Sequence, residues 1–179
     1  MRGFNTFETR WGVGAAVFSE KGLVGIVLPY ESKLELEQEI ARRFGEQTYN
    51  KNLGKPLCSS LARYFLGDVV QFNIQVDYGN ATDFEILIYS NLRAIPYGET
   101  LSYKKLAELS GRPRAARAVG NALAKNPLPI VVPCHRVIRS DGSIGGWSGK
   151  REWKEKLLKI EGVAPTALGG RPSVVNFQR

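Results

Sequence analysis

The sequence is poor in the side chains that bind metals or form disulfides. It has 179 residues but only one histidine, His135, and two cysteines, Cys58 and Cys134. Two cysteines far apart in the chain do not build the disulfide framework of a small secreted domain. One histidine and two cysteines also do not fill a four-ligand zinc site without carboxylates. We therefore expect free thiols in a reducing compartment, no bound metal and no cofactor.

Long apolar runs are lacking as well. The chain has no apolar stretch of about 18 residues, the length that a membrane-spanning helix needs. Its N-terminus also lacks the basic, apolar and small-residue regions of a secretory leader. We expect a protein that has no membrane association and that resides in the cytoplasm, or in the nucleus of a eukaryote.

Acidic side chains are scarce in the second half of the chain. The net charge is +8, but residues 1–90 carry nine Lys and Arg against eleven Asp and Glu, whereas residues 91–179 carry sixteen against six. Clustered basic side chains displace counterions from phosphates. A well-solvated basic surface would also explain a positive charge, but its concentration in one half favours a polyanionic partner.

The first half has the patterns of a small α+β domain. Two β-rich runs within residues 4–30 flank a short turn with a glycine, which predicts a hairpin. Apolar residues recur every four positions over Lys33–Phe44, which predicts a helix that ends at Gly45. Alternation over Phe72–Val76 predicts a third strand. We expect residues 1–78 to form a domain with a β-meander and flanking helices.

A second helix is predicted in this domain from about Pro56 to Leu66, followed by Gly67. Cys58 lies beside the apolar stripe of that helix. A free cysteine in such a position is usually a small buried core residue, so we do not expect it to be reactive.

A turn-rich segment, Asp77–Ala81, separates this domain from a second one over residues 79–165, and residues 166–179 form a loose Gly-, Pro- and Ser-rich tail. Thr82 and Glu85 have the spacing of a capping box, which predicts the start of a helix. Its buried stripe is expected to contain the apolar residues Phe84, Leu87, Ile88, Leu92 and Ile95.

Two short helices with a glycine turn between them are predicted next. Ser102 is placed to cap the first, over residues 103–109, and Pro113 is placed at the first position of the second, over residues 114–124. A short helix pair whose second member is basic is typical of a helix-turn-helix. In the second helix, Arg114 and Arg117 stand among alanines such as Ala116. Small side chains allow close approach to DNA, although an alanine face also serves ordinary helix packing.

The segment Asn126–Ile138, NPLPIVVPCHRVI, carries the candidate chemistry. Its prolines exclude a helix, and the apolar run before Cys134 predicts an extended, buried path. Burial raises the pKa of a thiol, so Cys134 needs a base, and His135 is the available one. Adjacent residues seldom face each other, so a bridging water or a backbone bend is required. Glu161, which ends a helix predicted over residues 151–160, is the candidate that orients His135.

This Cys–His–acid set also fits a cysteine protease or hydrolase, but the basic helix pair favours a nucleic-acid substrate. Three stretches, IPYGETLSYKKLAELSG, RPRAARAVGNALAKNPLPIVVPCHRVI and SDGSIGGWSGKREWKEKLLKIEG, closely resemble the O6-alkylguanine-DNA alkyltransferases. The match covers about residues 82–162. The first half is similar to this family only in layout, a small ribonuclease-H-like domain. The resemblance implies an α+β protein whose second, mainly helical domain contains a winged helix-turn-helix.

The resemblance also implies a reaction. The alkyl group of O6-alkylguanine in DNA, and of O4-alkylthymine, would pass irreversibly to Cys134, so that each molecule reacts once, as a suicide transferase. The protein would bind double-stranded DNA as a monomer through the minor groove. It would flip the damaged nucleotide out of the helix, because the base cannot meet a buried sulfur while it remains stacked.

Individual roles follow from the same resemblance. His135, through a water, and Glu161 would remove the thiol proton, Tyr103 would donate a proton toward guanine N3, and Asn126 would brace the turn before Cys134. Arg117 would replace the flipped nucleotide in the stack. The remaining DNA contacts are expected from Ser102, Tyr103, Arg114 and Ala116, and the alkyl and base pocket from Pro129, Val137, Trp147, Ser148 and Gly149.

Two departures from the family pattern stand out. Trp147 occupies a position that is commonly Tyr in the family, and the zinc ligands found in the first halves of some relatives are missing. Two other functions remain. A non-catalytic lesion-binding protein is disfavoured because such relatives replace the cysteine, and a cysteine hydrolase of unrelated fold is disfavoured by the helix-turn-helix pattern.

Overall fold

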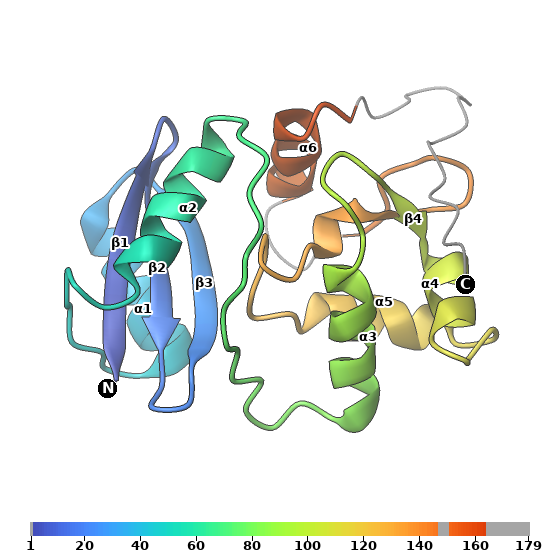
Figure 1. The fold of residues 1–179 in the computed structure, drawn as a ribbon, viewed down its shortest axis with the longest axis horizontal. Helices are drawn as coiled ribbons and strands as arrows, with labels where there is room; N and C mark the ends of the chain where they lie inside the picture. Colours follow the sequence, from blue (N-terminus) through green and yellow to red (C-terminus); the bar gives the residue numbers. More distant parts are fainter. Residues whose placement is uncertain (1, 147–150, 164–179) are drawn as a thin grey trace. The chain divides into compact units, whose positions relative to one another are not determined.

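The computed structural model describes residues 2–146 and 151–163 (Figure 1). The chain forms two compact units. Unit 1 contains the residues up to Gly79 together with Pro127–Pro129, and unit 2 contains Asn80–Asn126 and the residues from Ile130 onward. The second unit therefore surrounds, in sequence, three residues that pack with the first.

Unit 1 is built on a three-stranded antiparallel sheet. The strands are β1 (Gly3–Thr9), β2 (Gly12–Phe18) and β3 (Leu23–Tyr30), in the order β1-β2-β3. The predicted hairpin is confirmed as β2 and β3, which pair from Val13 with Tyr30 to Phe18 with Leu23. Strand β1, which pairs with β2, was not predicted as a separate strand.

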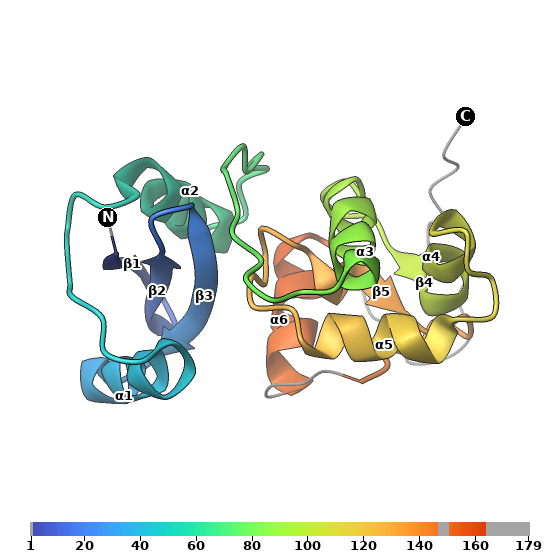
Figure 2. The ribbon, with the colours of Figure 1, turned by 90° about the horizontal axis from the view of Figure 1, so that it is seen from below.

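Helices α1 (Lys33–Phe44) and α2 (Lys55–Phe65) cover opposite faces of this sheet, as Figure 2 shows. Leu36 and Ile40 of α1 share a buried cluster with Phe4 of β1. On the other face, Phe65 of α2 stacks on Phe7 at 5.8 Å between ring centroids. Both helices have the bounds that their apolar spacing predicts, within one residue, because each buries one stripe against the sheet.

The predicted strand Phe72–Val76 is wrong. Only Val76 forms a bridge, to Leu23, and residues 72–75 are not part of a strand. Its alternation comes from packing, since Phe72 lies against Tyr64 at 6.2 Å between ring centroids. Period-two alternation shows that a chain is extended but does not show that it is paired.

Cys58 is buried in α2, as predicted, with 6% of its surface exposed. Burial raises the pKa of its thiol to about 11. A thiol that stays protonated at neutral pH is a poor nucleophile, which agrees with a structural role.

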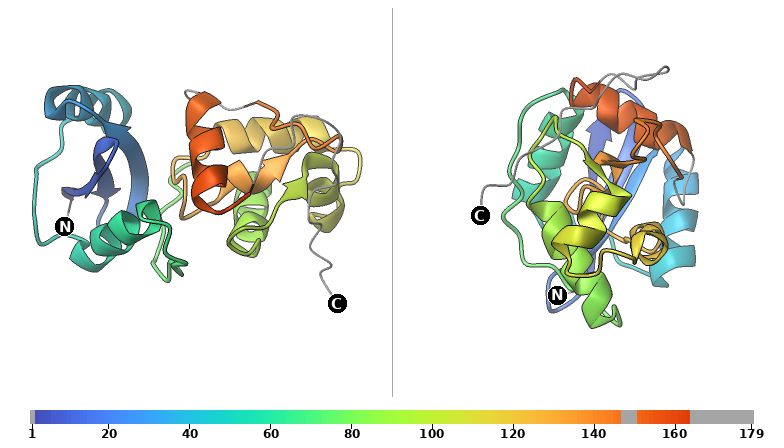
Figure 3. Two further views of the ribbon diagram at one scale, coloured as in Figure 1. Left: turned by 90° about the horizontal axis from the view of Figure 1, so that it is seen from above. Right: turned by 90° about the vertical axis from the view of Figure 1, so that its right-hand side faces the viewer.

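Unit 2 has a mixed α/β architecture in which helices predominate (Figures 1 and 3). The elements are α3 (Asp83–Arg93), β4 (Leu101–Ser102), α4 (Tyr103–Leu109), α5 (Ala116–Ala124), a short 3-10 helix (Cys134–Arg136), β5 (Val137–Ile138) and α6 (Arg151–Ile160). Helices α3, α4 and α5 contact one another, and α6 contacts the 3-10 helix. A two-stranded parallel sheet joins β4 to β5, with Leu101 opposite Val137.

Local capping signals predict the helix starts of unit 2 well. The capping box is confirmed, because the Thr82 side chain accepts from the Glu85 amide and the Glu85 carboxylate accepts from the Thr82 amide. Ser102 caps α4 by accepting from the Lys105 amide at 3.1 Å. Leu87 is a wrong prediction for the buried stripe of α3, since 42% of its surface is exposed. Ile88 is buried as predicted, and Tyr89, which was not predicted, is buried beside it.

The predicted start of α5 at Pro113 is also wrong. The helix begins at Ala116, because a turn in which the Ala115 amide donates to the Arg112 carbonyl at 2.8 Å precedes it. Helix α6 has the predicted bounds, with Trp153 and Leu157 buried. Ile160 is only partly buried, and Lys154 and Leu158 are buried in its place.

The approach to Cys134 is a turn, whereas an extended path was predicted. Ile130 adopts φ +76°, and among the described residues it is the one non-glycine with positive φ. The apolar run Ile130–Val132 is nevertheless buried as expected. A β-branched residue in this left-handed conformation is strained, so the surrounding packing must stabilise the turn.

Among the described residues, no helix has the length and apolar character that crossing a lipid bilayer requires.

Candidate functional site

Cys134 is the first residue of the 3-10 helix and is almost completely buried, with 5% of its surface exposed. The side-chain amide of Asn126 donates to its sulfur at 3.0 Å and to the Val132 carbonyl at 2.8 Å. Asn126 therefore holds both the sulfur and the turn before it. Burial raises the pKa of the Cys134 thiol to about 11, and the Asn126 hydrogen bond opposes part of this rise.

His135 and Glu161 form a fully buried pair. Nε2 of His135 lies 2.7 Å from Oε1 of Glu161, and both side chains have no exposed surface. Burial lowers the pKa of His135, so the imidazole is neutral at pH 7. Because an ionised carboxylate only accepts, Nε2 carries the proton and Nδ1 carries the lone pair. The pair thus presents Nδ1 of His135 as a base.

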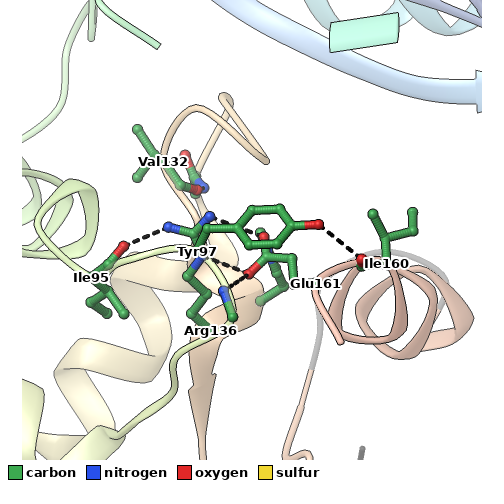
Figure 4. A network of polar contacts seen from close by, with 9 residues as sticks. Ile95, Tyr97, Val132, Arg136, Ile160 and Glu161 are labelled. Atoms are coloured by element: carbon green, nitrogen blue, oxygen red, sulfur yellow. Dashed lines mark hydrogen bonds and ion pairs between the residues drawn. The ribbon is translucent and has the colours of Figure 1, made fainter. Parts of the chain in front are cut away.

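Arg136 keeps Glu161 ionised (Figure 4). Its guanidinium donates to both carboxylate oxygens, at 2.9 Å and 3.0 Å, and also to the carbonyl of Ile95. Burial alone would raise the pKa of Glu161, but the hydrogen bonds from His135 and Arg136 outweigh it and bring that pKa below its ordinary range. The two-pronged ion pair also fixes the orientation of the carboxylate.

The loop after α3 completes this network. The Gly98 amide donates to Oε2 of Glu161 at 3.1 Å. The Tyr97 hydroxyl donates to the Ile160 carbonyl at 2.9 Å (Figure 4). The end of α6 and Glu161, which follows it, are therefore bonded to the loop that precedes β4. Four donors from two segments, the 3-10 helix and the loop after α3, hold one carboxylate in place behind His135.

A pocket of about 410 Å³ opens onto Cys134. Ala116, Arg117 and Gly120 of α5 line one side of it, and Tyr103 of α4 lines another. Pockets of this size accommodate small molecules and single bases. The small residues of α5 leave room beside the sulfur, which gives a ligand access to a side chain that is otherwise buried.

Tyr103 and Lys154 lie together beside this pocket. Nζ of Lys154 donates to the Val137 carbonyl at 2.6 Å and contacts the Tyr103 hydroxyl and the Gly146 carbonyl, each at 3.4 Å. Lys154 has no exposed surface, and burial lowers its pKa to about 8. Burial also raises the pKa of Tyr103, so its phenol remains a proton donor at neutral pH.

Most of the predicted site residues are brought together, but some lie elsewhere. Arg117 and Ala116 line the pocket, whereas Arg114 is exposed in the turn before α5 and does not line it. Val137 is buried and presents its carbonyl to Lys154. Pro129 is buried but packs with unit 1 and is not among the pocket-lining residues. Trp147, Ser148 and Gly149 lie outside the described residues.

Sequence reasoning missed three charged residues of the site: Arg136, Lys154 and Arg139. Arg136 follows the Cys–His pair directly, so its position was a usable signal. Lys154 lies three residues before the buried Leu157 and therefore on the same inward face of α6, so the helical spacing in the sequence also indicated its position. Arg139, which lines the pocket, carries no local signal of that kind.

Within residues 2–146 and 151–163, no cluster of three or more His, Cys, Asp or Glu side chains is arranged to hold a metal ion.

Comparison with known proteins gives a consistent result for this site. The model of the family "6-O-methylguanine DNA methyltransferase, DNA binding domain" matches residues 83–163. A methylated-DNA–protein-cysteine methyltransferase of Methanosarcina barkeri is 43% identical over 112 residues, which are 63% of this chain and 70% of that protein. The protein of the same name from Mycolicibacterium paratuberculosis is 46% identical over 101 residues, which are 56% of this chain and 61% of that protein.

Solved structures are similar over both units. The crystal structure of Mycobacterium tuberculosis O6-methylguanine methyltransferase has a TM-score of 0.74 and 32% identity, and the match covers 93% of this chain and 96% of that one. The structure of the same protein in complex with DNA also has a TM-score of 0.74 at 32% identity, covering 91% and 95%.

Proposed function

Because this chain belongs to the family of methylated-DNA–protein-cysteine methyltransferases, we propose that Cys134 is the residue that accepts the alkyl group. The protein is a methyltransferase that repairs DNA by direct alkyl transfer. The observation that carries the assignment is a single one. Cys134 faces a pocket of about 410 Å³ and lies next in sequence to the buried His135–Glu161 pair.

The proposed reaction starts with removal of the thiol proton. His135 accepts it at Nδ1 through a bridging water, and Glu161 stabilises the resulting imidazolium through Nε2. The Cys134 sulfur then attacks the alkyl carbon, a sulfur–carbon bond forms, and the bond from that carbon to O6 breaks with its electron pair remaining on guanine. The base then takes up one proton, so that unmodified guanine leaves.

Tyr103 is proposed to donate that proton toward guanine N3. Two observations support this role, since Tyr103 lines the same pocket as Cys134 and burial raises the pKa of its phenol. Proton donation stabilises the guanine anion as it departs. The hydroxyl lies near two further polar atoms, Nζ of Lys154 and the Gly146 carbonyl, which fix its position.

DNA is proposed to bind through α4 and α5, arranged as a winged helix-turn-helix, with α5 in the minor groove. Arg117, which is exposed and lines the pocket, would fill the gap that a flipped nucleotide leaves. The remaining DNA contacts would come from Ser102, Tyr103, Arg114 and Ala116. We further propose that residues 1–78 form a ribonuclease-H-like domain and that residues 79–165 form the helix-turn-helix alkyltransferase domain. The protein would be a cytoplasmic monomer, and it would also accept O4-alkylthymine as a substrate.

Intact-mass analysis tests the assignment. Incubation with duplex DNA that contains O6-methylguanine should add one methyl group per protein molecule, located on the Cys134 peptide. Cys134→Ala should gain no mass, whereas the matched control Cys58→Ala should gain the same methyl group as the wild type. An unchanged wild-type mass together with tight binding to the damaged duplex would instead indicate a lesion-binding protein.

A further inference from the structure

Arg139 is an exposed residue that lines the Cys134 pocket. It follows β5 directly, and both its backbone amide and its backbone carbonyl form hydrogen bonds with the turn that comes after it. The Arg139 amide donates to the Ser143 carbonyl at 2.8 Å, and the Gly142 amide donates to the Arg139 carbonyl at 3.0 Å. The side chain of Arg139 therefore starts from a well-ordered turn and reaches the pocket that contains Cys134.

The glycine that faces Arg139 leaves room for its side chain. Gly145 has φ +76°, and a Cβ atom added there would lie 3.4 Å from Cγ of Arg139 and 3.1 Å from the Tyr103 ring. The aliphatic part of Arg139 thus runs across Gly145 beside Tyr103. Arg139 and Tyr103 both line the pocket, so this path lies beside a group that is proposed to act on the base.

Within the described residues, the guanidinium of Arg139 makes no hydrogen bond or ion pair. Asp141 is the acid in the same turn, and its Oδ1 accepts hydrogen bonds from the amide and the hydroxyl of Ser143, at 2.9 Å and 2.7 Å. Asp141 therefore affects Arg139 only through longer-range attraction. A ligand group with negative charge would be a better partner for this guanidinium.

The charge around the pocket is positive. Among the residues that the structure describes, its lining contains Arg117 and Arg139 but no acidic residue. Glu161 lies behind His135, and Arg136 already neutralises it through two hydrogen bonds. In the proposed complex Arg117 enters the DNA stack, so Arg139 remains as the cation that faces the adduct. Buried Lys154, on the far side of Tyr103, adds to the same field.

From this arrangement we propose that Arg139 selects alkyl groups that carry a carboxylate, with O6-carboxymethylguanine in DNA as the simplest substrate. The inference rests on the proposed function. The same displacement applies, since a bond forms between the Cys134 sulfur and the methylene carbon while the bond from that carbon to O6 breaks. The electron pair leaves with guanine, and the product is S-carboxymethylcysteine.

Single-turnover rates on three duplexes test this proposal. They carry O6-methylguanine, O6-carboxymethylguanine, or the neutral carboxamide of the carboxymethyl adduct, which has the same shape without the charge. The ratio of the carboxylate rate to the carboxamide rate should be about tenfold higher in the wild type than in Arg139→Gln, as expected for the loss of one charge pair. Arg139→Glu should lower this ratio further. Arg112→Gln, which removes a charge outside the pocket, should keep the wild-type ratio.

Each failure has a distinct signature. An Arg139 that contacts a DNA phosphate would slow all three reactions by the same factor when replaced, with the ratio unchanged, and that result would overturn the proposal. Replacement of Arg139 that changes neither the rates nor the ratio would also overturn it while leaving the methyl-transfer function intact. Absence of transfer from all three duplexes would instead contradict the proposed function itself.

Discussion

Oε1 of Glu161 lies 2.7 Å from Nε2 of His135, while Arg136 holds both oxygens of the same carboxylate. Glu161 thus serves two partners at once. It fixes the proton of His135 on Nε2, and it compensates a buried guanidinium. Replacing this carboxylate should therefore affect both the rate of alkyl transfer and the stability of the fold.

Glu161→Gln should slow methyl transfer per folded molecule by about 100-fold, since the imidazolium loses its stabilising charge. It should also lower the free energy of unfolding by about 3 kcal/mol, because Arg136 becomes a buried charge without a counterion. Single-turnover kinetics and urea titration measure the two effects. Glu152→Gln, on the exposed face of α6, is the matched control and should change stability by less than about 0.5 kcal/mol. A normal transfer rate in Glu161→Gln would remove Glu161 from the mechanism.

Reaction of the free protein with iodoacetamide should follow the ionisation of Cys134. Because burial raises the pKa of its thiol to about 11, the rate at the Cys134 peptide should rise about tenfold per pH unit between pH 7 and pH 10. Asn126→Ala removes a hydrogen bond that favours the thiolate, so its profile should shift to higher pH. Peptide mapping separates Cys134 from Cys58.

Asn121→Ala, on the exposed side of α5, is the control for this experiment and should keep the wild-type profile. A Cys134 profile that reaches its plateau near pH 8 would show that the thiol is already activated in the free protein. That outcome would contradict the inference that burial keeps Cys134 protonated until a substrate occupies the pocket.

Arg117→Ala should slow transfer from duplex DNA at least about tenfold more than transfer from the free base O6-benzylguanine. The reason is that only the duplex reaction requires a residue to fill the stack. Rates on both substrates are measured under single-turnover conditions, with Arg63→Ala of α2 as a variant that removes a charge from unit 1. Equal slowing on both substrates would exclude the role of Arg117 in base extrusion.

Lys154 should leave a pH-dependent signature on stability. Burial lowers its pKa from 10.5 to about 8, so between these two values the unfolded chain holds a proton that the folded protein has released. Stability then rises with pH, by up to about 1.4 kcal/mol per unit, and below pH 8 the full cost of the buried charge remains. The wild type should therefore gain stability relative to Lys154→Met from pH 8 to about pH 10.5.

Urea titrations of both proteins at several pH values measure that difference, and the same comparison with Lys159→Met, an exposed lysine of α6, provides the control. A difference between wild type and Lys154→Met that stays constant over this pH range would show that the lysine is not desolvated in solution.

Signals that act over a few residues were sufficient for much of this structure. The capping box of Thr82 and Glu85 and the apolar spacing of Lys33–Phe44 depend on neighbours in sequence, so the corresponding helices were predictable. The scarcity of histidine singled out His135 beside Cys134, and the end of a predicted helix indicated Glu161. The structure places His135 and Glu161 in direct contact.

The predictions failed where tertiary packing decides. Alternation over Phe72–Val76 reflects packing on Tyr64 and not strand pairing, and the turn at Ile130 depends on contacts that hold a left-handed backbone. Charged residues are normally assigned to the surface, so the burial of Arg136 and Lys154 was not expected. Each of them is accommodated by partners that lie 17 to 41 residues away in sequence.

Pro127–Pro129 belong to unit 1, although they follow α5 of unit 2 in the chain. The Pro127 carbonyl accepts from the Ile26 amide of β3 at 2.9 Å and from the Arg43 guanidinium of α1. During synthesis the first unit therefore cannot be completed until residue 129 has left the ribosome, only five residues before the nucleophile. Domains usually fold in order from the N-terminus. Here the first unit needs residues that follow most of the helices of the second, so a chain that ends before Asn126–Ile138, the segment with the reactive cysteine, also lacks the last part of its first unit.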